Sequence, residues 1–111
     1  NFPLLFYRES TLAKLTIHFG GTMIREDEDY KYTGKLGVKV VSGELYDISW
    51  ARFFKFSSQE GKINAPIRFI WYKKIRDEMK TIDYVNEGND EDMFLLICMA
   101  KEAGEVEIFI E

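Results

Sequence analysis

The sequence predicts a small α+β domain in which a mixed sheet packs against two helices. Three observations favour this fold class: short segments with period-two alternation, two segments with apolar residues at helical spacing, and glycines between such segments. The chain has 111 residues, which suits one domain with one modest core. We therefore expect the strands and helices to form two layers around that core.

The first expected strand covers residues 14–19, where apolar residues alternate with polar ones on opposite faces. Its apolar face carries Leu15, Ile17 and Phe19. Gly20 and Gly21 follow, and a glycine pair tolerates the positive φ of a tight hairpin turn. We therefore expect residues 22–25 to return as a second, short strand.

The next segment is less regular. Residues 26–29 are four consecutive acids, which favours a solvated loop. Residues 30–43 contain three glycines, and only residues 38–41 have a strand-forming composition. We expect an irregular sheet edge with one further short strand.

The centre of the chain predicts a helix followed by a strand. The helix is expected to begin after Asp47 or Ser49 and to end near Gly61. Its buried stripe, at spacings of three and four residues, consists of Trp50, Phe53 and Phe54. After Pro66, the β-prone residues 67–74 predict a strand in which Ile67, Phe69 and Trp71 oppose Arg68, Ile70 and Tyr72.

The end of the chain predicts a second helix and a last strand. Asn89 is a good N-cap, and the acids after it favour the positive end of the helix dipole. The helical stripe consists of Met93, Leu96, Ile97 and Ala100. Gly104 ends the helix, and residues 106–110 alternate as a strand. The expected order is strand, strand, helix, strand, connecting region, helix, strand.

Composition and charge exclude several classes of function. The chain has 15 Lys and Arg against 19 Asp and Glu, and its net charge of -4 repels phosphate. Binding of nucleic acid through this domain is therefore not expected. The single Cys98 excludes a disulfide framework and a cysteine zinc site, and suits a reducing compartment. No apolar run approaches the roughly 20 residues that span a bilayer, so we expect no membrane association.

The sequence contains no complete catalytic or metal-binding motif. The one histidine, His18, falls on the outward face of a strand, and Cys98 falls on a helix without an activating neighbour. A calcium loop starting at Asp83 would place Val85 and Phe94 where carboxylates are required. The Gly20–Gly21 pair lacks the Lys-Ser/Thr of a phosphate-binding loop. We expect neither an enzyme nor a cofactor or metal.

Charged clusters remain as candidates for binding. The basic residues that could form one interaction face are Lys14, Lys73, Lys74 and Arg76. The acidic residues that could form another are Asp77, Glu78, Asp90, Glu91 and Asp92. Two interpretations stay open: a mixed solvated surface, or two faces of opposite sign that dock head to tail between molecules.

Several motifs, taken in order, resemble one family. The first strand carries Ile17-His18-Phe19-Gly20-Gly21, followed by Tyr32-Thr33-Gly34, by Asp47-Ile48-Ser49-Trp50 with Phe53, by Ile70-Trp71-Tyr72, by Asp90-Glu91-Asp92-Met93 and by the closing strand Val106–Ile110. This series resembles the Phox/Bem-one (PB-one) domains, and most of all the PB-one-like domain of plant Mutator-like transposases. The resemblance covers residues 13–111, and residues 1–12 are expected to be a flanking segment.

The resemblance implies a ubiquitin-like β-grasp fold and a protein-interaction module, for self-association or partner recruitment, within a larger transposase-like or transposase-derived nuclear protein. In the family, a lysine on the first strand meets an acidic motif of the partner. The lysine position is Thr16 here, Lys14 lies two residues earlier on the same face, and basic residues replace the acidic motif after Tyr72.

Three alternatives remain open. The first is a nucleic-acid accessory domain that uses Arg68, Lys73, Lys74 and Arg76. The second is a decoy domain integrated into an unrelated receptor or kinase. The third is purely structural: the apolar segment 2–7 could exchange as a strand between two chains.

Overall fold

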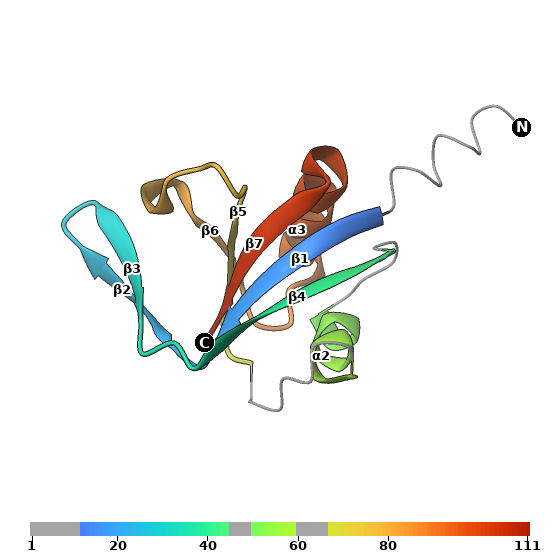
Figure 1. Cartoon of the computed structure of the whole chain (residues 1–111), viewed down its shortest axis with the longest axis horizontal. Helices are drawn as coiled ribbons and strands as arrows, with labels where there is room; N and C mark the ends of the chain where they lie inside the picture. Colours follow the sequence, from blue (N-terminus) through green and yellow to red (C-terminus); the bar gives the residue numbers. More distant parts are fainter. Residues whose placement is uncertain (1–11, 45–49, 60–66) are drawn as a thin grey trace, which may run out of the picture.

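The computed structural model describes residues 12–44, 50–59 and 67–111, and its main feature is a five-stranded sheet (Figure 1). The strand order across the sheet is β4-β1-β7-β5-β6. In that order the strands are Gly37–Glu44, Leu12–Phe19, Glu105–Ile110, Ile70–Lys73 and Asp83–Val85.

The two central strands come from opposite ends of the chain. β1 and β7 run parallel, with Ile17 opposite Ile108, while β4 pairs antiparallel with β1 and β5 pairs antiparallel with β7. A parallel pair at the centre with antiparallel neighbours on both sides is the arrangement of a ubiquitin-like β-grasp domain. The predicted fold class, α+β with a mixed sheet and two helices, is confirmed.

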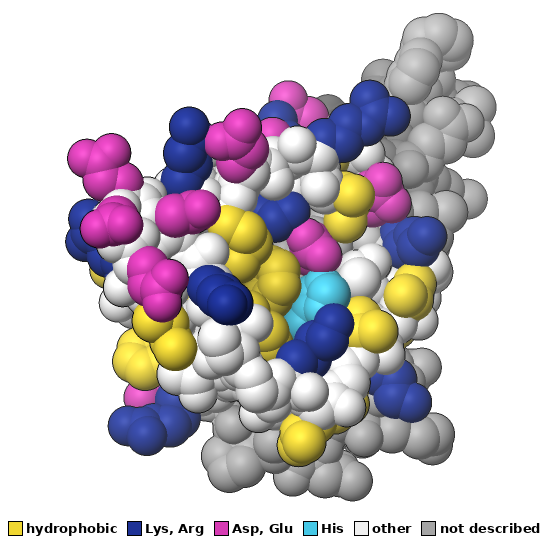
Figure 2. Space-filling view, turned by 60° about the vertical axis from the view of Figure 1, so that its left-hand side comes forward, with side chains coloured by type: hydrophobic (Ala, Val, Ile, Leu, Met, Phe, Trp, Pro, Cys, Tyr) yellow, Lys and Arg dark blue, Asp and Glu magenta, His cyan; other side chains and the backbone are white. Residues whose placement is uncertain are grey.

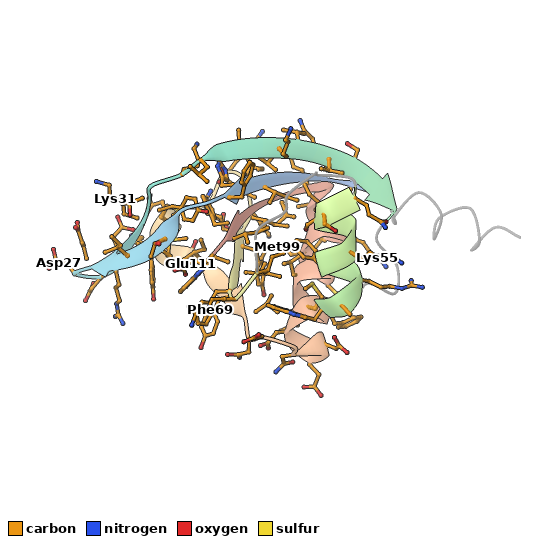
Figure 3. All side chains as sticks on the ribbon, turned by 90° about the horizontal axis from the view of Figure 1, so that it is seen from below. Asp27, Lys31, Lys55, Phe69, Met99 and Glu111 are labelled. Carbon is orange, nitrogen blue, oxygen red and sulfur yellow. The ribbon has the colours of Figure 1, made fainter. Side chains whose placement is uncertain are left out.

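Both helices lie on one side of the curved sheet (Figure 3). They are α2, Trp50–Gln59, and α3, Asp90–Ala103. The predicted stripe of α3 is confirmed, since Met93, Leu96, Ile97 and Ala100 are all buried. The core between the layers also contains Phe53, Leu15, Ile17, Ile70, Val106 and Ile108, and Trp50 packs at its margin.

The ends of α3 are also as predicted. The side chain of Asn89 accepts hydrogen bonds from the backbone N–H groups of Glu91 and Asp92, each at 3.0 Å. At the other end, Gly104 has the left-handed φ of 80°, and its N–H donates to Ala100. Local chemistry alone therefore sets where this helix begins and ends.

The predicted hairpin at Gly20–Gly21 is wrong. β2, Thr22–Glu26, pairs with β3, Asp29–Thr33, and these two strands form a separate sheet that projects from the main one (Figure 1). The chain leaves the main sheet at Gly20, whose φ is 86°, and returns at Leu36, whose N–H donates to Phe19 O at 3.0 Å. β4 thereby takes the place beside β1 that the sequence suggested for residues 22–25.

The acidic run and the segment after it are also more regular than predicted. Glu26 and Asp29 are the last facing pair of the β2–β3 hairpin, and only the two residues between them form its turn. Residues 29–33 are a strand, and β4 has eight residues where four were expected. Backbone pairing with β1 along its whole length overrides the weak strand propensity of the glycines in β4.

The strand expected over residues 67–74 is shorter, and the connecting region contains a strand that the sequence did not reveal. β5 covers only Ile70–Lys73, with Ile70 and Tyr72 turned toward the core. After it come a short 3-10 helix, Met79–Thr81, and then β6. β6 has three residues, too few for a periodic signal.

Some expectations fall outside the described residues. These are the caps Asp47 and Ser49, the helix end at Gly61, Pro66, and residues 1–11, together with the side chain of Phe54. Within the described ranges, neither helix has the length and apolarity needed to cross a membrane.

Candidate functional site

The face of the sheet opposite the helices, called the outer face here, carries a cluster of three charged or titratable side chains. Glu107 lies at its centre on β7. Its Oε2 is 2.7 Å from His18 Nε2 on β1, and its Oε1 is 2.6 Å from Lys73 Nζ on β5. Figure 2 shows this face, with the histidine in cyan. The His18–Glu107–Lys73 cluster thus joins three adjacent strands.

Burial and charge oppose each other at Glu107. Burial by itself would raise the pKa of this carboxyl, but the hydrogen bonds from Lys73 and His18 and their charges outweigh it. The pKa of Glu107 is therefore lowered from its ordinary value. The carboxylate form is the one that this cluster stabilises.

Lys73 is the most enclosed member of the cluster, with only 7% of its side chain exposed. Besides Glu107, its ammonium group donates to the backbone carbonyls of Lys74 and Ile75, each at 3.3 Å. An ammonium group has three N–H donors, so all three are used within the molecule. Lys73, predicted as part of the basic interaction face, is thus not free to bind a partner's carboxylate.

Aromatic rings enclose the histidine. The His18 ring stacks on Phe109 at a centroid distance of 4.5 Å, and Tyr32 meets Phe109 at 5.2 Å. The Tyr32 hydroxyl accepts from Gly21 N–H at 2.8 Å and donates to Ile110 O at 2.6 Å. Burial raises the pKa of Tyr32 above its ordinary value. The His-x-Gly-Gly and Tyr-x-Gly motifs of the sequence therefore meet at one place.

A second group of rings lies beside this cluster. Trp71 contacts Tyr30 at 5.5 Å and Tyr84 at 5.3 Å between ring centroids. The indole Nε1–H of Trp71 donates to Glu111 at 2.7 Å, which fixes the ring on the outer face. These contacts attach the β2–β3 hairpin to the main sheet through side chains.

The chemistry of the outer face is that of a structural network. Tyr32 has its hydroxyl hydrogen-bonded on both sides, and a raised pKa is the opposite of what activates a nucleophile. In residues 12–44, 50–59 and 67–111, no three His, Cys, Asp or Glu side chains are placed to hold a metal ion.

The remaining predicted basic residues lie near one end of α3. Lys74 and Arg76 are exposed and line a groove of about 410 Å³. The groove, called the α3 groove here, is lined by Lys74, Ile75, Arg76, Asp77, Ala103 and Glu105. Lys14 is exposed on β1, opposite Glu105 in the β1–β7 register. The groove itself is lined by two cations, Lys74 and Arg76, and by two carboxylates, Asp77 and Glu105.

The predicted acidic residues do not form one face. Asp77 lines the α3 groove among the cations, and Glu78 pairs with Lys80 at 3.1 Å. Asp90, Glu91 and Asp92 form the first turn of α3, called the acidic end here. Because the 14 residues of α3 span about 20 Å, the acidic end lies far from the α3 groove.

Two carboxylates of the acidic end have structural partners. Asp90 Oδ1 accepts from the backbone N–H of Trp50, the first residue of α2, at 2.9 Å. Asp92 Oδ2 accepts from the backbone N–H of Asn86 at 3.0 Å and from its side-chain amide at 2.8 Å. Glu91 is exposed, and its backbone N–H, not its carboxylate, takes part in the Asn89 cap.

The four residues of the alternative nucleic-acid patch are not brought together. Arg68 precedes β5, whereas Lys74 and Arg76 follow it, and extended chain between them spans about 20 Å. Lys73, between them in sequence, is buried in its ion pair. This placement leaves two separate cationic positions instead of one stripe along a groove.

Sequence reasoning missed Glu107 as the centre of the outer face, and it named Tyr32 only as part of the Tyr-x-Gly motif. The only available signal was the alternation of the last strand, whose outward positions include Glu107. The β5–β7 register places Lys73 directly opposite Glu107, and Thr16 faces Glu107 from β1. The cation paired with Glu107 within the molecule is therefore Lys73 of β5.

Comparisons with known proteins give one structural likeness. No family model and no curated protein matches the chain. The solution structure of the PB1 domain of Cdc24p (long form) is similar to it, with 14% identity over 89% of this chain and 97% of that chain, and a TM-score of 0.44. The strand order described above, and not this distant likeness, identifies the fold as a ubiquitin-like β-grasp.

Proposed function

We propose that this domain is a protein-interaction module whose α3 groove receives an acidic surface of a second protein molecule. The observation that carries the proposal is the separation of charge along α3. The exposed cations Lys74 and Arg76 line the groove near the C-terminal end of α3, where Asp77 and Glu105 also lie, and the acidic end is about 20 Å away. The two groove cations and the acidic end cannot meet within one molecule, but they are suited to meet between two.

A second copy of this chain is the simplest partner. Its acidic end would enter the α3 groove of the first copy. This contact is heterologous, so one groove and one acidic end of the pair stay unused and can bind further copies. Exposed Ile75 and Ala103 add apolar contact area at the groove. A host protein with an acidic segment would use the same groove.

The wider setting is proposed from the sequence resemblance. We place the domain among PB-one-like modules and its parent among plant transposase-like or transposase-derived nuclear proteins. Support comes from the way in which the resembling motifs assemble: the Tyr32 hydroxyl accepts from Gly21 N–H, and the Tyr32 ring lies edge-on to the His18 ring with centroids 6.4 Å apart. The β-grasp fold agrees with this setting.

Self-association is tested by measuring mass in solution over a concentration series. Two variants each weaken one surface. Lys74→Ala with Arg76→Ala changes the groove, and Glu91→Gln changes the acidic end together with Glu87→Gln, at an exposed position in the turn just before α3. Asp90 and Asp92 are left unchanged because they have hydrogen-bond partners within the fold. We expect the wild type to associate, each variant alone to be monomeric, and their mixture to form one-to-one dimers.

The mixture is the decisive measurement, because it contains one intact groove and one intact acidic end in each pair. A wild type that stays monomeric and also fails to bind hexaglutamate peptide in preference to hexaglutamine would overturn the proposal. Lys31→Ala, which removes an exposed cation from β3, serves as the matched control and should associate like the wild type.

A further inference from the structure

The turn that lines the α3 groove is held from beneath by a buried ion pair. Residues 74–77 form the turn, which is closed by a hydrogen bond from Asp77 N–H to Lys74 O at 3.1 Å. That same carbonyl also accepts from Lys73 Nζ at 3.3 Å. The next carbonyl, of Ile75, accepts from the same ammonium group at 3.3 Å.

Lys73 itself is placed where it cannot touch a ligand in the groove. It does not line the groove, and its third donor goes to Glu107 Oε1 at 2.6 Å. Glu107 in turn is held on its other oxygen by His18. Glu107 on β7, itself held by His18 on β1, therefore fixes the position of the Lys73 ammonium group. Through its hydrogen bonds to the carbonyls of Lys74 and Ile75, the ammonium group in turn fixes the turn.

We propose that Lys73 is a positioning residue for the α3 groove: together with Glu107 it fixes the 74–77 turn, so that the exposed cations Lys74 and Arg76 are presented in one arrangement. The inference rests on the proposed function of the groove. It differs from a direct role for Lys73 in binding, which its sequence neighbours would suggest. Preorganised charges bind more tightly because less conformational freedom is lost on binding.

The test compares Lys73→Met, Lys73→Arg and Lys31→Met with the wild type by two readouts. The first is hydrogen exchange of the Asp77 amide, which reports whether the turn is closed. The second is affinity for hexaglutamate peptide. We expect Lys73→Met to speed exchange of the Asp77 amide about five- to tenfold and to weaken peptide binding. Lys73→Arg should restore both in part, and Lys31→Met should change neither.

Several outcomes separate the two proposals. If Lys73→Met leaves the Asp77 amide protected as in the wild type, the positioning role is wrong. If the wild type and the Lys74→Ala/Arg76→Ala variant bind hexaglutamate equally, the proposed function of the groove fails, while the Asp77 amide still decides the role of Lys73. Should Lys73→Met fail to fold, Glu107→Gln replaces it: faster exchange of the Asp77 amide supports positioning, and unchanged exchange overturns it.

Discussion

His18 and Lys73 hold opposite oxygens of the Glu107 carboxylate, at 2.7 and 2.6 Å, across the three central strands of the sheet. The cluster lies on the outer face, away from the apolar core, yet Lys73 is almost fully enclosed. A charge in such a place is stable only while its partner remains charged. Protonation or substitution of a residue in this cluster should therefore lower the stability of the whole fold.

The first prediction concerns the acid sensitivity of this cluster. The folded-state pKa of Glu107 is lowered from its ordinary value of 4.5, so the unfolded chain binds more protons than the folded one as pH falls toward and below that value. The stability contributed by Glu107 is present above about pH 4.5 and is lost as pH falls through the folded pKa. Glu107→Gln should destabilise the fold by about 3 kcal/mol at neutral pH, because it leaves Lys73 without its counter-charge.

Denaturant unfolding of wild type and Glu107→Gln at neutral and acid pH checks this. The difference in free energy of unfolding should shrink in acid, where the wild-type carboxylate is protonated as well. Exposed Glu102→Gln is the control and should stay within about 0.5 kcal/mol of the wild type at neutral pH. Parallel pH curves for wild type and Glu107→Gln would show that the cluster does not couple pH to stability.

Sequence signals that are complete within a few residues, such as helix caps and apolar stripes, predicted the structure well. Asn89, Gly104 and the stripe from Met93 to Ala100 lie within one helix, and each signal is complete in the local sequence. The two central strands were found for the same reason. Their alternation directly reflects one buried face and one outer face.

Features that depend on pairing between distant segments were not predictable. A glycine pair indicates a turn but does not say which strand follows beside β1, and that choice was wrong for residues 22–25. Likewise, the sequence around Lys73 is that of a solvated basic run. Lys73 is placed opposite Glu107 and buried only through the β5–β7 register, which joins residues more than thirty positions apart. The binding roles of the charged residues stay predictions.

The second prediction concerns Gly21, which lies under the Tyr32 ring. A Cβ at this position would lie 2.6 Å from Thr33 O and 2.8 Å from the Tyr32 ring, so the hairpin would have to move. Gly21→Ala should cost about 3 kcal/mol and disturb the near-ultraviolet circular dichroism of the aromatic cluster.

Gly88→Ala is the comparison for Gly21→Ala. Gly88 has a φ of 73° with no atom near an added Cβ, so its replacement should cost only backbone strain, about 1 kcal/mol. The aromatic signal should be unchanged in this variant. Equal costs for the two substitutions, with unchanged aromatic signals in both, would mean that the close approach of Tyr32 to Gly21 is not needed for stability.

The third prediction assigns Asp90 a role in α2, forty residues earlier in the chain. Its carboxylate accepts from the backbone N–H of Trp50, one of the N–H groups that a helix leaves unpaired at its start. Asp90→Ala should therefore destabilise the domain by about 1 kcal/mol beyond Glu91→Ala, which removes a similar charge from the same turn of α3. Thermal unfolding of the two variants measures the difference, and identical melting temperatures would exclude the cap.

The last prediction concerns alkaline pH and Tyr72, which is buried in the core. Burial, followed by the nearby carboxylates of Asp83 and Asp92, raises the pKa of Tyr72 to about 12 from 10.0. The unfolded tyrosine ionises first, so this contribution to stability is complete below pH 10 and is lost as pH rises toward 12. Phenylalanine keeps the ring packing, so Tyr72→Phe should cost less than about 1.5 kcal/mol at neutral pH.

Above pH 10, Tyr72→Phe should lose less stability than the wild type as the pH rises. Unfolding followed by circular dichroism at stepwise alkaline pH gives the two curves. The difference in phenolate absorbance between the native wild type and native Tyr72→Phe, which keeps the other five tyrosines, reports the late titration. Glu107 should not contribute to this difference, because its ionisation is complete far below this range. Identical alkaline curves for the two proteins would mean that the Tyr72 phenol ionises no later in the folded state than in the unfolded chain.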